Sequence, residues 1–586
     1  MSSKPKPPSL ITTEFEQTRR RVTISVIAIF LLAAPVWWKT TEVYRAPLPV
    51  DDIRAWAKAE SLHQTLAVKI DLYFNALPET KNAAHLASSV SSELATLYAT
   101  AQDSKAETVP PEESENDVAG DVPVADPVIN LFFDVRSGSS GEYSAADLSN
   151  GHYAVQTSCG VGSKVMIRVD AGRTVHVKLP DCTNDPFVTS VLTSTIAGLF
   201  ADEQLSYRSM LKHTSLANTN TDWENMLTMK YARNYQVTFS LLNADPSHVR
   251  VGWDIRDAIK EYVTPFLNTL DDISGFSVHS QTQNYATLPI TPQVVNKDGH
   301  DLHVISPDML PQFINSAQWN LASVVTTAPP LNFILYIPSK AQSPLHVVKA
   351  NGDIHAANAF LMPRWGGIAI ANPPATDGVY HYTVDELVPF MEIFVSQLRD
   401  LLGVKRIKIP NANLLLPGAE IEYAESPTTG ITQWEHDRLV RHRTIQNMRD
   451  AVQTLNSLAT LIQKLESMVV LDVIQHQVLQ ALTHLRSAHS SLQTDSETPS
   501  NYTLASLHAR RAITASESAF FDPTMVAMLY FPDEHKYAVY MPLFVPVSVP
   551  VIIAVIREVK RWKDERRVKK KKVPSGVALV HHAKSE

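Results

Sequence analysis

The chain has 586 residues, of which 44% are hydrophobic and 19% are charged, and it carries a formal net charge of −8. This composition excludes a disordered chain, and the length predicts two to four structural units. With only two cysteines, Cys159 and Cys182, the chain is not a disulfide-dense secreted scaffold. A single bridge between the two cysteines is possible in an oxidising compartment.

The charge is distributed unevenly along the chain. Residues 1–21 carry five Lys or Arg against two Glu, a net +3, and residues 557–572 carry ten Lys or Arg against three acids, a net +7. The segment between them, residues 22–556, therefore carries −18. Basic ends around an acidic middle are typical of a chain whose ends face an anionic cytoplasmic leaflet while its middle lies elsewhere.

An uncharged apolar run follows the basic N-terminal tail, residues 1–21, and occupies residues 22–38. Its length is at the short limit for crossing hydrocarbon about 30 Å thick. A cleaved signal peptide would share the basic start and the apolar core, but Pro35 directly follows the one small-residue site and disfavours cleavage. Trp37 and Trp38 fit an interfacial aromatic belt. We therefore predict an uncleaved transmembrane helix here, preceded by a cytosolic tail.

Residues 39–430 mix the hydrophobic periodicities of strands and helices, which predicts an α/β (mixed α+β) domain. Thr383, with Glu386 three residues later, forms a capping-box pattern at the start of a helix that ends at Gly403. Residues 102–126 are acidic, contain proline and lack aromatics, which predicts a flexible loop. The predicted strands cover 66–74, 128–135, 164–179 with a turn at Ala171–Gly172, 235–243, 331–338 and 345–350, and the predicted helices start at 51 and cover 254–270 and 383–403.

The segment 431–498 contains neither glycine nor proline, and apolar residues recur in it at helical spacing. One straight helix of that length would measure about 100 Å, so we predict two or three antiparallel helices. A further helix is predicted over 506–521, so that a lumenal helical block extends over 431–536. The predicted apolar stripe consists of Ile445, Met448, Val452, Leu455, Ala459 and Ile462, continued by Ile474, Val478, Leu482 and Leu485.

A second uncharged run, residues 537–556, is too long and too apolar for an ordinary soluble core element. We predict a second transmembrane helix here, followed by a basic cytosolic tail over 557–586. Pro542, Pro546 and Pro550 recur at every fourth residue and therefore lie near one face, where each removes a backbone hydrogen bond. Two interpretations remain open: a bent helix without a special role, or a face that packs on helices of another subunit, which would cover the freed carbonyls.

The positive-inside rule orients both spans in the same way, because basic residues precede the first and follow the second. Both termini are then cytosolic, and residues 39–536 lie on the other side, which in a eukaryotic cell is the lumen. The sequon Asn501-Tyr502-Thr503 falls in this region and makes Asn501 a candidate for N-glycosylation.

The search for catalytic residues finds no established motif. Cys159 and Cys182 are possible nucleophiles and the chain has 21 histidines, but nothing in their spacing selects a pair, so a bridge or a buried thiol is the simpler interpretation. No G-x-S-x-G elbow, P-loop or G-x-G-x-x-G occurs, so no cofactor is expected.

Metal and nucleic-acid sites are not expected either. No H-E-x-x-H occurs, and we interpret the histidines of GHDLH (299–303) and EHDRLVRH (435–442) as surface or core residues. The basic run 557–572 directly follows a predicted membrane helix and contains one aromatic residue, Trp562. Membrane lipid headgroups therefore fit this run better than nucleic acid.

Four stretches together resemble the PIG-S family, a subunit of the GPI transamidase complex. They span nearly the whole chain, and they match the family in order and spacing around the predicted topology, whereas none of them is a catalytic motif. The stretches are VWWKTTEVYRAPLP (36–49), FLMPRWGGIAIANPP (360–374), GITQWEHDRLVRHRTIQNMRDAVQTLNSL (430–458) and FPDEHKYAVYMPLFVPVSVPV (531–551).

The resemblance implies a protein of the endoplasmic reticulum membrane with two transmembrane helices and a large lumenal domain. Its complex removes a C-terminal signal from precursor proteins and attaches a preassembled GPI anchor. In the family the catalytic cysteine–histidine pair belongs to the PIG-K subunit, and the other expected partners are PIG-T, GPAA1 and PIG-U. We therefore expect a non-catalytic structural subunit without cofactor. The alternatives are a lumenal enzyme that uses Cys159 or Cys182 and a lumenal adaptor that signals through its basic tail.

Overall fold

The computed structural model divides into two compact units. The larger comprises residues 49–457 and 477–520, and the smaller comprises residues 1–48, 458–476 and 521–586. The acidic segment 102–126 lies outside the described residues. The structure describes residues 9–41, 44–58, 66–74, 88–94, 129–137, 148–160, 164–182, 184–211, 227–297, 300–314, 319, 321, 327–374, 378–410, 412–465, 468–492, 501–524 and 533–571.

The first sheet of the larger unit has six strands in the order β16-β4-β5-β3-β1-β2. All neighbouring strands run parallel except β4 and β5, which form an antiparallel hairpin around the predicted turn at Ala171–Gly172. The strand predictions for this sheet are confirmed. The bounds are β1 Leu66–Phe74, β2 Ile129–Ser137, β3 His152–Cys159, β4 Met166–Val169, β5 Thr174–Leu179 and β16 Glu420–Tyr423, and the helices α2 Val50–Ala57, α4 Asp185–Leu211 and α9 Ala412–Leu415 belong to the same unit.

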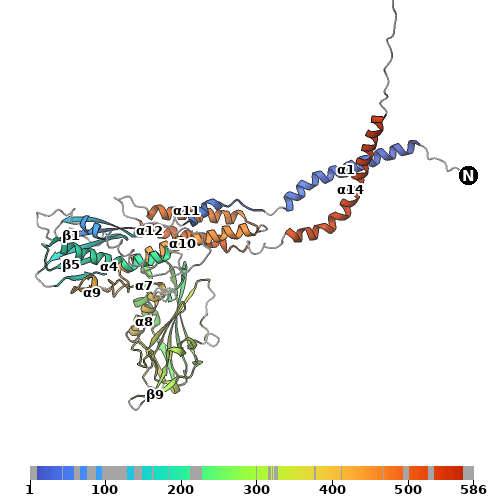
Figure 1. Cartoon of the computed structure of the whole chain (residues 1–586). Coiled ribbons are helices and arrows are strands. Elements are labelled where there is room, and N and C mark those ends of the chain that lie inside the picture. Colours follow the sequence, from blue (N-terminus) through green and yellow to red (C-terminus); the bar gives the residue numbers. More distant parts are fainter. Residues whose placement is uncertain are drawn as a thin grey trace, which may run out of the picture. The chain divides into compact units, whose positions relative to one another are not determined.

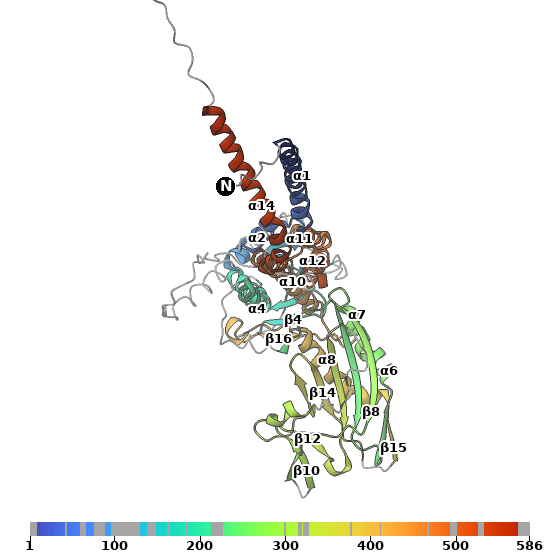
Figure 2. The same ribbon diagram turned by 90° about the vertical axis from the view of Figure 1, so that its right-hand side faces the viewer.

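The second sheet has five strands in the order β13-β14-β11-β6-β8, parallel except for the β13–β14 hairpin. Nearly every residue of β6 and β11 is buried, as expected for parallel strands covered on both faces. Helix α8 packs along this sheet (Figure 2), where its Phe394 meets Phe239 and Phe333. The bounds are β6 Asn234–Asn243, β8 Gly275–Asn284, β11 Pro330–Ile337, β13 Ala359–Met362, β14 Gly366–Ile370 and α8 Val384–Leu402.

Helix α8 begins and ends as the sequence predicts. The Thr383 backbone N–H donates to the Glu386 carboxylate at 2.9 Å, as in a capping box, and Gly403 ends the helix with a left-handed backbone (φ 81°). The predicted helix over 254–270 is divided into α6, a π-helical turn η3 and α7. Their bounds are Ile255–Ala258, Ile259–Val263 and Thr264–Thr269.

Two small sheets complete the α/β part, in the orders β12-β10-β9 and β15-β7. A cluster of buried aromatic residues, Phe313, Trp319 and Tyr336, fills the core beside β12 and β14. The bounds are β7 Val249–Trp253, β9 Gln293–Lys297, β10 His300–Ile305, β12 Leu345–Val347 and β15 Gly378–Tyr382, with the short helices η4 Pro307–Gln312 and η5 Lys340–Gln342.

The glycine-free segment forms two helices, α10 Gln433–Lys464 and α11 Asp472–Leu492, and a third, α12 Tyr502–Phe520, follows. The three lie side by side (Figure 1). Every residue of the predicted apolar stripe is buried, which confirms that the 3-4 spacing identifies the packed faces.

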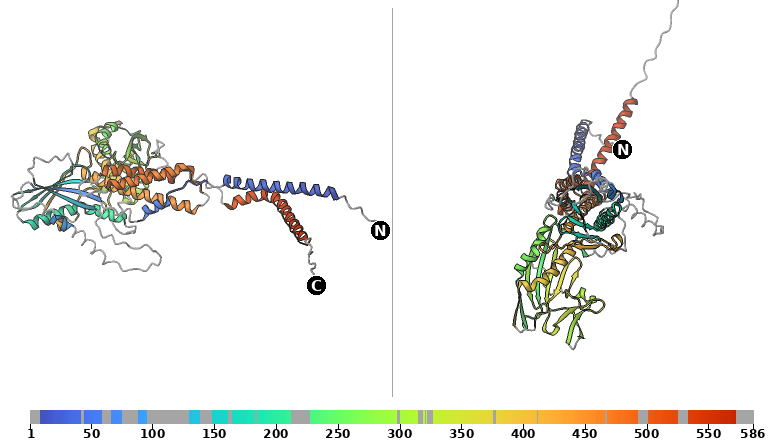
Figure 3. Two further views of the ribbon diagram at one scale, coloured as in Figure 1. Left: turned by 90° about the horizontal axis from the view of Figure 1, so that it is seen from above. Right: turned by 90° about the vertical axis from the view of Figure 1, so that its left-hand side faces the viewer.

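The smaller unit contains the helices α1 Ser9–Thr41 and α14 Asp533–Lys571, which are drawn in Figure 3. By length and composition, Ala538–Asp564 is a candidate membrane span, the single one found among the described residues. Helix α14 contains all three prolines and bends along its length (Figure 3), as the predicted loss of backbone hydrogen bonds leads us to expect. Helix α1 continues through Pro35 and covers the predicted first span, while the side chains of Trp37 and Trp38 lie outside the described part.

The segment after α1 is held to the turn between α10 and α11. The Arg45 guanidinium donates to the carbonyl oxygens of Ile462 (2.8 Å), Leu465 (2.5 Å) and Met468 (3.0 Å), around the C-terminal end of α10. Ala46 N–H donates to the Val470 carbonyl at 2.9 Å. Arg45 therefore caps the helix, because it satisfies terminal carbonyls and places a cation at the negative end of the helix dipole.

Candidate functional site: the charged face of helix α10 and the pocket beside it

Helix α10 begins with an unusual concentration of charge, WEHDRLVRHR, and most of it is buried. Asp437 is 0% exposed and accepts hydrogen bonds from Arg173 at 2.5 and 2.7 Å and from the Tyr153 hydroxyl at 3.1 Å. Burial raises the pKa of Asp437, but the hydrogen bonds from Arg173 outweigh it and hold the pKa below its usual value. Asp437 is therefore an ionised carboxylate that ties α10 to the first sheet.

One turn further along, Arg441 is 1% exposed and makes a bidentate pair with Glu203 of α4, at 2.7 and 2.8 Å. Arg441 also donates to the Tyr153 hydroxyl at 2.6 Å, and the Tyr207 hydroxyl donates to Glu203 at 2.7 Å. Charges taken out of water cost several kcal/mol each unless they are paired and fully hydrogen-bonded, and this pair meets that condition.

The first turn of α10 contacts helix α8 and the turn after α7. Glu435 accepts from Arg399 of α8 at 2.7 Å and from the Thr432 backbone N–H at 2.9 Å, so it also closes a capping box. His436 lies 3.1 Å from the Asp272 carboxylate, in the turn after α7. Successive residues of one helix thus bind elements of both sheets.

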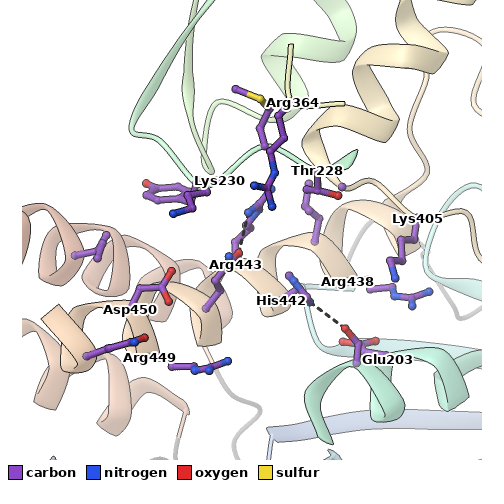
Figure 4. Close-up of a pocket in the computed structure, with 18 of the residues that line it drawn as sticks. Glu203, Thr228, Lys230, Arg364, Lys405, Arg438, His442, Arg443, Arg449 and Asp450 are labelled. Carbon is purple, nitrogen blue, oxygen red and sulfur yellow. Dashed lines mark hydrogen bonds between the residues drawn. The ribbon is translucent and has the colours of Figure 1, made fainter. Parts of the chain in front are cut away.

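A cavity of about 530 Å³ opens beside this helix. Figure 4 shows that α10, the segment before β6, the β13–β14 turn and the segment after α8 all contribute to its lining. Arg364 in that turn has a left-handed backbone (φ 55°), which is uncommon for a residue other than glycine. The cations that line the pocket are Lys230, Arg364, Lys405, Arg438, Arg443 and Arg449.

Four carboxylates also line this cavity, but two of them are already neutralised by other residues. Glu203 is paired with Arg441, and Glu435 is paired with Arg399. The other two are Asp450 and Glu517, and burial raises the pKa of both. Asp450 lies near Arg449, Lys230 and Arg443, whose positive charges act to lower its pKa against the effect of burial.

The two most buried cations of the pocket, Arg443 and Arg438, differ in how completely they are hydrogen-bonded. Arg443 is 5% exposed and donates to the Leu402 carbonyl and the Gln446 side chain, both at 2.8 Å, so neutral acceptors satisfy it. Arg438 is 7% exposed, and its Nη2 has no hydrogen-bond partner among the described residues. Burial, together with the charges of Arg443, Lys405 and Arg438, lowers the pKa of the neighbouring His442 to about 3. His442 is therefore neutral at pH 7.

The two predicted cysteine candidates lie elsewhere and are joined to each other. Cys159 ends β3 and Cys182 follows β5, and their sulfur atoms are bonded with 5.9 Å between the Cα atoms. No cysteine is free. Over the described ranges, no group of three or more His, Cys, Asp or Glu could hold a metal ion.

The remaining predicted residues lie outside the pocket. Asn501 is exposed, and its Oδ1 accepts from the Leu504 N–H at 2.9 Å, so it caps α12. Pro542, Pro546 and Pro550 are all exposed on α14.

Sequence reasoning missed the pocket altogether. Its cations come from four separate segments, and only those of α10 share a local pattern. One available signal was Thr432 with Glu435 three residues later, which marks the start of α10 and fixes the helical phase of the charges that follow.

The fold and site together define a class: a mixed α/β protein with several mixed sheets, a long apolar C-terminal helix, and two cysteines bonded to each other. The family model described as phosphatidylinositol-glycan biosynthesis class S protein, PIG-S, matches residues 24–565. The chain belongs to this family.

Relatives in mammals and yeast are similar over nearly their whole length. The cattle protein named GPI-anchor transamidase component PIGS is 30% identical, with 91% of this chain and 93% of the relative covered. The human protein of that name is 29% identical over the same shares. The fission yeast GPI transamidase component PIG-S homolog is 26% identical, with 94% of this chain and 85% of the relative covered.

Proposed function

We propose that this chain is a non-catalytic structural component of the GPI transamidase complex in the endoplasmic reticulum membrane. The observation that carries the proposal is the Cys159–Cys182 disulfide. Acyl transfer through a thioester needs a free thiolate, and both cysteines of the chain are bonded. The catalytic cysteine–histidine pair would then belong to a partner, PIG-K, with PIG-T, GPAA1 and PIG-U as the other expected subunits.

The proposed topology has two spans, residues 22–38 and 537–556, with both termini cytosolic and residues 39–536 lumenal. Helix α1 covers the first of these segments and α14 covers the second. Arg19 and Arg20, which precede the first, lie 3.6 and 3.2 Å from Glu558, which follows the second. These ion pairs support a topology in which the two basic ends share one side of the membrane.

The proposed role is to hold partners in place. Transfer of a membrane-tethered peptide to a membrane-tethered amine gains from fixing both reactants in one orientation. Two spans and a large lumenal domain provide a frame for this, and the proline-bearing face of α14 is exposed and available for helices of other subunits.

The proline-bearing face of α14 allows the proposed structural role to be tested. Replacing Pro542, Pro546 and Pro550 together by leucine should straighten α14 and reduce co-purification of the transamidase subunits from detergent, measured by mass spectrometry. The matched control carries Phe544→Leu, Ser548→Leu and Ile552→Leu, which lie about 200° further round the helix at the same spacing.

We expect the control to retain its partners at the level of the unaltered chain. If the proline variant and the control recover their partners equally, this face does not pack on other subunits. Failure of the unaltered chain to co-purify with any transamidase subunit would overturn the proposed function itself.

A second candidate, a lumenal enzyme using Cys159 or Cys182, requires a thiol that the disulfide removes. An adaptor that signals through the basic tail has no recognition motif beyond charge in residues 557–572. The structural role is therefore the proposal that we favour.

A further inference from the structure

We propose that the free edge of strand β8 binds an extended segment of another transamidase subunit, which adds a strand to the second sheet. β8, Gly275–Asn284, is the last strand of that sheet (Figure 2), and among the described strands it pairs with β6 alone. The free edge is the side of β8 that faces away from β6. The site is argued from the backbone of β8, whereas the identity of the partner rests on the chain's proposed function in the transamidase.

The register identifies the backbone groups that point out of the free edge. Strands β6 and β8 are parallel and stay in register along the whole of β8. The Gly275 N–H donates to the Arg233 carbonyl at 2.9 Å, so Gly275 faces β6. Because backbone groups alternate between the two sides of a parallel strand, every second residue after Gly275 also faces β6, and the residues between them face outward. The outward residues are Phe276, Val278, Ser280, Thr282 and Asn284.

The outward residues present a row of N–H donors and carbonyl acceptors that has no partner strand. Over the described part of the chain, no residue donates to these carbonyls or accepts from these N–H groups. Ser280, Thr282 and Asn284 are exposed, so the row is open to solvent over the second half of the strand. Alternate residues of a strand are about 6.6 Å apart, which is also the spacing of the acceptors and donors of a second extended backbone. The edge therefore selects an extended segment rather than a helix.

β8 lacks the features that protect the other edges of the two large sheets. Edge strands avoid unwanted pairing by being short or by carrying charged residues or proline. In the first sheet, the edge strand β16 has four residues including two glutamates, and the edge strand β2 carries Asp134 and Arg136. At the other edge of the second sheet, β13 has four residues. β8 has ten residues, without a charged residue or a proline. A long unprotected edge of this kind is expected where a partner strand covers it.

The side chains beside the free edge indicate the chemistry of the partner. Ser277, Ser280, Thr282 and Asn284 are exposed, and β8 carries no charge. Hydroxyl side chains form hydrogen bonds across neighbouring strands, so a segment rich in serine, threonine, asparagine or glutamine fits this edge. The chain is a component of the GPI transamidase and assembles with other subunits. We therefore assign the strand to one of those subunits, and a second copy of this chain is the alternative that the test must exclude.

Hydrogen exchange measured by mass spectrometry tests the edge without any mutation. The full chain is purified in detergent, alone and within the transamidase, and exchange is followed in peptides that cover residues 275–285. The outward amides should exchange at least about tenfold more slowly in the complex, because a partner strand bonds them, whereas the amides that face β6 should be protected in both samples. Equal exchange in both samples overturns the proposal. If exchange slows in the isolated chain as its concentration rises, and light scattering shows a dimer, the edge binds a second copy and the proposal is overturned.

The variant Ser280→Pro/Thr282→Pro removes two outward N–H donors and leaves the hydrogen bonds to β6 in place. The matched control, Ser280→Val/Thr282→Val, alters the same side chains but keeps both donors. We expect the proline variant to recover at least one transamidase subunit about tenfold less than the unaltered chain, because main-chain hydrogen bonds provide the affinity of an added strand. The valine control should stay within about twofold. Quantitative mass spectrometry of the purified complex measures both.

Hydrogen exchange of the amides that face β6 shows whether the strand is intact in the proline variant. Equal recovery of every subunit by the proline variant and the valine control, with these amides still protected, overturns the proposal and leaves the chain a transamidase component. If the unaltered chain recovers no subunit, the proposed function fails, and the partner named here fails with it. A proline variant that does not fold leaves the decision to the exchange measured on the unaltered chain.

Discussion

At the scale of single residues, the most informative feature is the burial of charge on α10. Asp437 and Arg441 are fully buried, and each is paired with a residue from another element, Arg173 or Glu203. A buried pair of this kind adds little net stability over a well-packed apolar pair, but removing one member leaves the other charged and unpaired. These residues therefore specify where α10 sits within the larger unit.

We predict that Arg441→Ala lowers the free energy of unfolding by about 3–5 kcal/mol, because Glu203 is left buried without its partner. Arg486→Ala is the control: this arginine pairs with Asp52 at 2.9 Å, but both side chains are more than half exposed. Removing an exposed pair costs about 1 kcal/mol or less. Chemical denaturation of the purified chain measures both, and similar losses for the two variants would show that the α10 network is not stabilised by pairing.

His436 makes stability depend on pH. Burial lowers the pKa of His436, but the hydrogen bond to Asp272 and the negative charge of Asp437, 3.6 Å from Nδ1, outweigh it and raise the pKa to about 9. The ordinary pKa of about 6.5 applies in the unfolded chain. The stabilisation is therefore complete below pH 6.5 and is lost as the pH rises from 6.5 to 9.

The loss of stability over this interval is on the order of 3 kcal/mol. The pKa of His442 is lowered, so His442 affects stability only below pH 6.5. It therefore does not contribute to the decline between pH 6.5 and 9. His436→Gln should flatten the decline when unfolding is measured at several values between pH 6.5 and 9. An equally steep decline in the variant would assign the pH dependence to other groups.

At the scale of elements, local patterns predicted most of the long helices and seven of the sixteen described strands, but they missed α4 and strands such as β3, β8 and β14. The period-two stretches became β1, β4 and β5, the capping box and the terminal glycine fixed α8, and the 3-4 stripe identified the buried faces of α10 and α11. These features depend on neighbouring residues, so a single sequence contains the necessary information.

The sequence did not predict how these elements pair. Strand β16, at residues 420–423, lies beside β4, at residues 166–169, and nothing in either stretch indicates its partner. The division of the α/β segment into two sheets depends on such distant pairings. For the same reason the pocket was missed: Lys230, Arg364 and Lys405 are ordinary loop cations until the fold brings them to α10.

At the scale of the whole molecule, the chain combines long apolar sequence at each end with a large α/β and helical region between. Arg45 ties the segment that follows α1 to the end of α10 within the smaller unit. The chain belongs to the PIG-S family, whose members are components of the GPI transamidase complex. The disulfide argues against a reaction at a cysteine thiol of this chain. These observations together support the proposed structural role.

The central claim is that this chain positions the reaction and supplies no nucleophile. Its most direct test is the variant Cys159→Ser/Cys182→Ser, expressed in cells that lack their own PIG-S. The measurement is the amount of a GPI-anchored reporter at the cell surface, divided by the amount of assembled transamidase that co-purifies with the chain. This ratio separates chemistry from the loss of stability, about 2–5 kcal/mol, that removal of a disulfide commonly causes. We predict a ratio within about twofold of the unaltered chain, because loss of a catalytic nucleophile would lower it by several orders of magnitude. A fully assembled complex without reporter at the surface would contradict the claim.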